Sequence, residues 1–119
     1  MNAPIASPYL DTMPLAPIAQ ESNAELIASL VAVSYRLTLD DLKYGDKTAR
    51  ILEARQVAQW VLRRQLRLSF PEIGRVMNRD HSTVMHSCRA IEKRRAFEEV
   101  FAQFLDRLIT AIAERIDSE

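Results

Sequence analysis

Apolar positions recur at helical spacing along most of the chain, and short polar segments with capping residues separate the runs. Residues 22–35 place their apolar side chains on one helical face, and Ser22 or Asn23 can cap that helix. Thr38 to Gly45 predicts a short helix, and a longer amphipathic helix rich in arginine begins near Asp46. Since no segment alternates with a period of two, the pattern predicts an all-α fold, a compact multi-helix domain.

The segment after the long helix predicts two short helices joined by a tight turn. Ser69 is a good N-cap, Pro71 falls in the first turn, where a proline is tolerated, and Asn78 can end the helix in the left-handed conformation. Asp80 can then cap a second helix, whose apolar stripe is formed by Val84, Cys88 and Ile91. Two helices joined in this way form a helix-turn-helix.

A last amphipathic helix is predicted in "AFEEVFAQFLDRLITAIAERI". Its apolar residues at helical spacing are Phe97, Phe101, Phe104, Leu105, Leu108, Ile109 and Ile112. This surface either folds back over the first and third helices, including Trp60, or associates with a second copy of the chain. We expect the first arrangement and a monomer; a dimer through this helix is the alternative.

The N-terminal segment differs from the rest in composition. Residues 1–22 hold four of the five prolines and show no helical period, so we predict a flexible, disordered tail followed by one helical domain over residues 23–119. The chain has no apolar run near the length of a membrane span, no secretory signal pattern, and one cysteine, which cannot form an internal disulfide. These features favour a soluble cytoplasmic protein without a membrane partner.

Charge is unevenly distributed along the chain, although its formal net charge is zero. Between Lys43 and Arg95 there are 13 Lys or Arg residues against five Asp or Glu, a net charge of +8, and the flanking segments carry −8. A basic segment of this kind is typical of a surface that binds a polyanion. The other interpretation is a solvated helix surface with a chance imbalance.

The stretch "NRDHSTV" at residues 78–84 combines the groups that hydrogen-bond to base edges at the start of the second helix of the pair. Opposite the apolar stripe lie Ser82, His86 and Arg89, with His81 and Thr83 at the tip. A helix-turn-helix inserts this end of its second helix into the major groove of DNA. Asp80 could accept from a cytosine amino group, and the Thr83 methyl could meet a thymine methyl. Nearby arginines, among them Arg63 and Arg64, would hold phosphates.

Other chemistries are less well supported by the same residues. Adjacent His and Asp on a helix point about 100° apart, and no oxyanion element is evident, so we predict no catalytic residue. His81 and His86 lack the i, i+4 spacing of a zinc helix, and no metal site or cofactor is predicted. The only glycines are Gly45 and Gly74, so neither a P-loop nor a dinucleotide loop can form, and no nucleotide ligand is expected.

Three motifs in order give the chain a family resemblance: "ARQ" at residues 54–56, "SFPEIG" at 69–74 and "RDHSTV" at 79–84. Together they resemble domain IV, the DNA-binding domain of the bacterial replication initiator DnaA, over roughly residues 35–95. The resemblance implies that the chain recognises a short double-stranded DnaA box. It places Arg79, Asp80, His81, Ser82 and Thr83 at the major groove, Phe70 and Pro71 near the DNA, and Lys47 in the adjacent minor groove.

The sequence therefore predicts a double-stranded DNA-binding protein, associated with the bacterial nucleoid, that regulates transcription or replication initiation. The pattern does not separate these two processes. The alternative is a protein-interaction module that keeps the fold but docks a protein partner.

Overall fold

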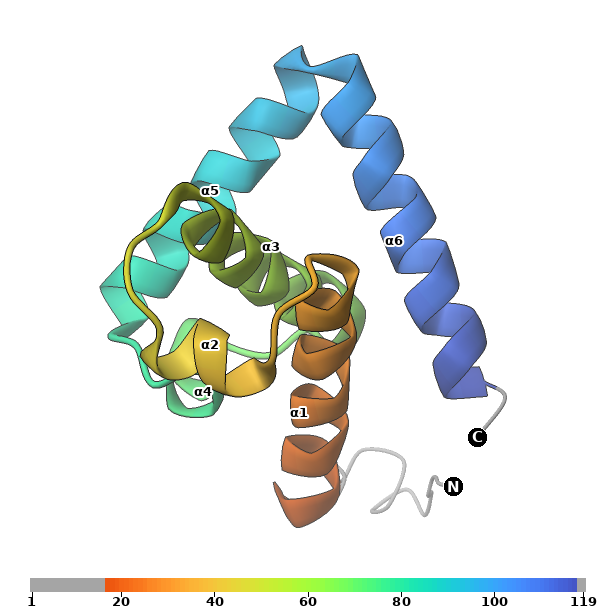
Figure 1. Ribbon diagram of the computed structural model, residues 1–119. Helices are drawn as coiled ribbons and strands as arrows, with labels where there is room; N and C mark the ends of the chain where they lie inside the picture. The colour runs from red at the N-terminus through yellow and green to blue at the C-terminus, as the bar shows by residue number, and fades with distance from the viewer. Residues whose placement is uncertain (1–16, 118–119) are drawn as a thin grey trace.

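The computed structural model describes residues 17–117, with side chains from residue 23 onward. In that part of the chain six helices and no strand are present, which confirms the predicted all-α class (Figure 1). The helices are α1 (Pro17–Ser34), α2 (Leu39–Tyr44), α3 (Ala49–Leu66), α4 (Phe70–Met77), α5 (His81–Phe97) and α6 (Glu99–Asp117). None of the helices in the described range is both long and apolar enough to span a membrane.

Side-chain caps fix where the short helices begin. Thr38 and Ser69 each form a capping box, in which the hydroxyl accepts the N3 backbone N–H and the N3 carboxylate accepts the cap's own N–H. Asp80 caps α5 by accepting the N–H of Ser82, and Asn78 ends α4 with φ 57° and ψ 50°. The predicted helix-turn-helix boundaries are therefore confirmed, because each polar residue satisfies backbone groups that a helix end leaves unpaired.

Helix α3 is the centre of the core. It packs against α1, α2, α4 and α5, and a continuous run of its residues from Val57 to Leu62 is buried. Trp60 is a large buried side chain in this run, and its indole Nε1 donates to Glu92 of α5 at 2.7 Å. The burial of α3 on several sides therefore fixes the positions of the two helices of the helix-turn-helix relative to α1.

Helix α6 folds back beside α5 and reaches α1. Figure 1 shows α5 and α6 meeting at the top of the molecule and diverging downward, with α6 on the side away from α2 and α4. The apolar side chains that α6 buries are Phe101, Leu105, Leu108 and Ile112. The fold-back expected from the sequence is present, but the main contacts of α6 are with α5 and α1, whereas α3 was also expected to lie beneath it.

Three predicted helix boundaries were wrong. Helix α1 begins at Pro17, inside the predicted tail, because a proline is compatible with the first turn of a helix; residues 1–16 of that tail lie outside the described residues. Helix α3 begins at Ala49 and not near Asp46, because Asp46 accepts the Thr48 N–H and Thr48 is the cap.

The third wrong boundary lies between the last two helices. Helix α5 continues to Phe97, and Glu98, with an extended backbone, separates it from α6. Phe97 was predicted on the apolar face of the last helix, but it ends α5 and is 81% exposed. No glycine or proline marks this break, so the helical period alone could not locate it.

Gly74 allows the turn between α4 and α5 to pass close to α4. The Arg79 N–H donates to the Gly74 carbonyl at 2.8 Å, and a Cβ at position 74 would lie 2.4 Å from the Arg79 carbonyl oxygen. Since that oxygen belongs to the backbone, the turn would have to move.

We therefore expect Gly74→Ala to lower the free energy of unfolding by about 1–3 kcal/mol, measured by urea denaturation. Asn78→Gly in the same turn is the matched control. It should change stability by less than about 1 kcal/mol, because glycine adopts the left-handed conformation readily. Equal stability of Gly74→Ala and the wild type would contradict the close approach.

Candidate nucleic-acid interface

One side of α5, from its first residue to Lys93, presents a polar face to solvent. Its opposite side buries Val84, Ser87, Cys88 and Ile91, which includes the apolar stripe predicted from the sequence. The residues left exposed on the other side are His81, Thr83, His86, Arg89 and Lys93, with Ser82 partly covered. The described structure thus groups these hydroxyl, imidazole and cationic side chains on one surface of one helix.

Asp80 is engaged at the tip of α5. One carboxylate oxygen accepts the Ser82 N–H at 2.9 Å, and the other lies 3.8 Å from His81 Nδ1. Both side chains remain largely exposed, at 65% and 62% respectively. Asp80 therefore stabilises the start of the helix and still offers acceptor capacity beside an exposed imidazole.

Arg79 lies at the same end, and its guanidinium is bound to backbone carbonyls. Its Nη1 donates to the Lys43 carbonyl at 2.8 Å and to the Asn78 carbonyl at 2.7 Å, and the residue is only partly exposed. The sequence groups Arg79 with residues 80–83, whereas the structure directs its guanidinium toward the end of α2.

Lys47 is exposed in the loop between α2 and α3, and a buried arginine supports that loop from inside. Arg55 of α3 donates from Nε to the Leu42 carbonyl at 2.7 Å, and from Nη2 to the carbonyls of Gly45 and Asp46 at 3.2 and 3.4 Å. Burial, followed by the charge of Arg79, lowers the pKa of the Arg55 guanidinium. Sequence reasoning missed this role; the signal available was an arginine among apolar neighbours within "ARQ".

The remaining predicted residues lie around two surface hollows. A hollow of about 520 Å³ is lined by Pro71, Gly74, Arg75, Asn78, Arg79, Asp80 and His81. A second, of about 420 Å³, is lined by Trp60, Arg63, Arg64, Phe70, Cys88, Arg89 and Glu92. Both hollows involve α4 and α5 and are lined by most of the predicted site residues, whereas Lys47, Ser82, Thr83 and His86 line neither of them.

Arginine side chains cover the aromatic groups of the second hollow. Arg63 lies 4.3 Å from the ring centroid of Phe70 and donates to the Leu68 carbonyl, and Arg64 lies 5.3 Å from the Trp60 ring. Burial raises the pKa of the Cys88 thiol to about 11, which keeps it protonated near neutral pH. The hollow is therefore a cationic surface with an apolar floor and not a reactive thiol site.

The far end of α5 is held by a charged network that the sequence did not predict. Arg94 donates to Glu53 at 2.7 Å and to Glu98 at 3.0 Å, and the Tyr35 hydroxyl donates to Glu53 at 2.7 Å. Burial alone would raise the pKa of Glu53, but the hydrogen bonds from Tyr35 and Arg94 outweigh it and leave the pKa below its ordinary value. This network ties α5 to α3 and to Tyr35, the residue that follows α1, so the exposed tip belongs to a firmly held helix.

The arrangement supplies hydrogen-bond donors, acceptors and cations on the exposed side of one helix. No group of three His, Cys, Asp or Glu side chains within the described residues could hold a metal ion. What the surface can do chemically is bind a partner that carries anionic groups and hydrogen-bonding edges.

The sequence of this chain is similar to those of known bacterial proteins. A family model described as the bacterial DnaA protein helix-turn-helix matches residues 24–91. The chromosomal replication initiator protein DnaA of Microcystis aeruginosa is 33% identical over 111 residues, which cover 89% of this chain and 23% of that protein. The protein of the same name from Neisseria meningitidis is 34% identical over 117 residues, covering 94% of this chain. The chain thus spans about a quarter of the length of these relatives.

Solved structures show the same similarity in three dimensions. A crystal structure of a DNA replication initiation factor superposes on 82% of this chain with a TM-score of 0.74 at 26% identity. A structure of DnaA bound to AMPPCP and single-stranded DNA covers 80% with a TM-score of 0.64 at 29% identity. In each case about 30% of the solved chain is matched.

Proposed function

The chain belongs to the bacterial DnaA helix-turn-helix family, and from that premise we propose that it is a sequence-specific double-stranded DNA-binding protein. It recognises DnaA-box-like sites as a monomer, one protein on one site, and works by occupying the site, without catalysis. The observation that carries the proposal is the exposed polar tip of α5, held on a helix-turn-helix inside a segment of net charge +8.

Residue roles follow from exposure and chemistry. His81, Ser82 and Thr83 are placed to meet base edges in the major groove, with Asp80 accepting from a base amino group beside them. His86 and Arg89 lie further along the same face. Arg63, Arg64, Phe70 and Pro71 border the surface at α3 and α4 and contact the phosphate backbone, and Lys47 enters the neighbouring minor groove.

In the cell, such a chain would act at the sites that a replication initiator also recognises. It would regulate transcription from promoters that contain the box, or it would compete at origins and so modulate replication initiation. Both processes use the same binding event, and a genome-wide occupancy map would show whether promoters or origins dominate.

The experiment that tests the proposal is a titration of labelled duplexes by fluorescence anisotropy. One duplex carries a DnaA box and the other carries the same bases in scrambled order, each measured at several salt concentrations. We expect tighter binding to the box, and affinity that falls with salt with a log–log slope of about −0.9 per phosphate contacted. If neither duplex binds while the chain captures a protein partner independently of salt, the protein-interaction alternative holds instead.

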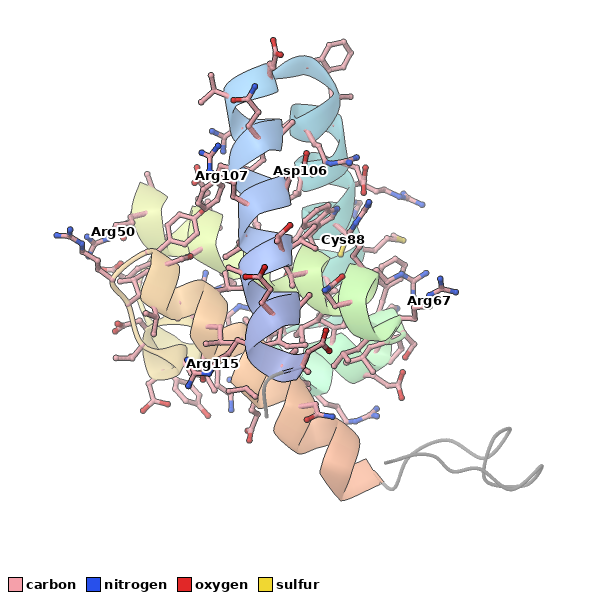
Figure 2. All side chains as sticks on the ribbon, turned by 90° about the vertical axis from the view of Figure 1, so that its right-hand side faces the viewer. Arg50, Arg67, Cys88, Asp106, Arg107 and Arg115 are labelled. Carbon is pink, nitrogen blue, oxygen red and sulfur yellow. The ribbon has the colours of Figure 1, made fainter. Side chains whose placement is uncertain are left out.

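Arg63→Ala and Arg64→Ala test the backbone contacts. Each should weaken binding to the box and to scrambled DNA by a similar factor and flatten the salt slope by about one unit, because a phosphate contact carries no sequence information. Arg107→Ala on α6, whose exposed side chain Figure 2 labels on the helix nearest the viewer, is the control and should leave the slope unchanged. If Arg63→Ala and Arg64→Ala leave the salt slope as unchanged as the Arg107→Ala control does, Arg63 and Arg64 do not contact the DNA.

A further inference from the structure

The guanidinium of Arg79 joins two parts of the molecule that are far apart in sequence. Arg79 lies in the turn between α4 and α5, directly before the cap of α5, and donates to the carbonyl of Lys43 in the last turn of α2, 36 positions earlier. The same Nη1 also donates to the Asn78 carbonyl, which fixes the side chain at its own base. Beyond Lys43 the chain enters the loop that carries Lys47.

Two guanidiniums therefore hold the carbonyls where α2 ends. Arg55 reaches the carbonyls of Leu42, Gly45 and Asp46 from the core, and Arg79 reaches that of Lys43 from the α4–α5 turn. The C-terminal end of a helix carries partial negative charge and unpaired carbonyls, which favour cations there. Among the described residues, the hydrogen bonds of both guanidiniums go to backbone carbonyls, and the nearby Asp46 carboxylate also acts on the charge of Arg55.

We propose that Arg79 is a positioning residue that sets the Lys47 loop at a fixed place relative to the tip of α5. The inference rests on the proposed function, because the loop and the tip are the two elements that would enter adjacent grooves. Among the hydrogen bonds of the described residues, that of Arg79 joins the last turn of α2, which leads into the loop, to the turn that precedes α5, whereas those of Arg55 join the loop to α3. Arg79 thus contributes to binding by aligning two contact elements and not by contacting a base.

The first test needs no DNA. In the free chain, the heteronuclear ¹H–¹⁵N NOE of the Asp46, Lys47 and Thr48 amides should fall in Arg79→Ala, because the loop gains motion on the picosecond to nanosecond scale. His81→Ala, two residues away with no contact to the loop, is the matched control and should leave these values unchanged. Unchanged loop NOEs in a folded Arg79→Ala protein would overturn the proposal.

The second test is a double-mutant cycle on the box duplex. Lys47→Ala should weaken binding about tenfold in the wild type but less than about twofold in Arg79→Ala. In the Arg79→Ala protein Lys47 is no longer held in position and contributes little to binding, so its removal has little effect. The fold-changes in Kd caused by Lys47→Ala and His81→Ala should instead multiply in the double variant, as expected for independent contacts. Full multiplication of the Lys47 and Arg79 effects would identify Arg79 as a separate DNA contact and overturn the positioning role.

The variant Arg79→Lys distinguishes a positioning role of Arg79 from a role of its positive charge. It also replaces Arg79→Ala in both tests if that variant does not fold. Lysine keeps the charge on a flexible stem without the planar fork, so it can replace a phosphate contact but holds a fixed position poorly. We expect Arg79→Lys to lower the loop NOEs and to reduce the effect of Lys47→Ala. A wild-type result in both measurements would overturn the proposal. If no variant changes DNA binding but the loop NOEs still fall, Arg79 does position the Lys47 loop, and the proposed DNA-binding function is wrong.

Discussion

A chain truncated after Arg95 is expected to lose its cooperative unfolding transition. The truncation removes α6 and with it the buried side chains of Phe101, Leu105, Leu108 and Ile112. Burying side chains of this size contributes about 1.5–3 kcal/mol each, so the four together approach the whole stability of a small domain, about 5–15 kcal/mol. The measurement is thermal and urea unfolding by circular dichroism.

Point substitutions in α6 make the same test without removing the helix. Leu105→Ala should lower the free energy of unfolding by about 2–5 kcal/mol, because Leu105 is fully buried. Asp106→Ala, at the next position and exposed, should change it by less than about 0.5 kcal/mol. Light scattering on both should show monomers. A stable dimer, together with a truncated chain that still folds and binds as a monomer, would show that α6 is an association surface.

His81→Ala is expected to remove most of the sequence preference of the protein. The imidazole is exposed at the tip of α5, beside the capping carboxylate of Asp80, and reaches outward from a helix held by the Arg94 network. Loss of one base contact costs about 1–3 kcal/mol, which is about 5- to 150-fold in Kd on the preferred site. Binding to scrambled DNA should change little, since phosphate contacts remain.

The measurement is a pair of anisotropy titrations with the box and scrambled duplexes at one fixed salt concentration. Thr110→Ala, an exposed polar residue on α6, is the control for a surface substitution and should leave both affinities unchanged. Equal losses on the two duplexes for His81→Ala would mean that His81 contributes to general affinity and does not recognise a base.

Much of the fold could be predicted because its signals are local. Capping by Thr38, Ser69 and Asp80 depends on one side chain and backbone N–H groups three residues away or fewer, so the residue type and its position suffice. The left-handed conformation of Asn78 was likewise predictable from its place after the last apolar residue of α4. The buried stripe of α5 followed from the helical period.

What the sequence could not show depends on contacts between distant segments. Arg55 and Arg79 are two of many arginines in a basic segment, and only the folded chain distinguishes those that donate to carbonyls of α2 from those that face solvent. The break at Glu98 and the exposure of Phe97 also depend on how α6 packs across α5 and α1. Figure 2 shows two of the exposed arginines, Arg50 and Arg67, which project from opposite sides of the molecule.

Whether the tip of α5 binds DNA can be measured by an NMR titration of the ¹⁵N-labelled chain with a DnaA-box duplex. We expect large shifts or broadening for the amides of residues 79–86 and of the Lys47 loop, and little change along the exposed face of α6. Perturbation confined to α6, with the amides of residues 79–86 unchanged at saturation, would contradict this expectation.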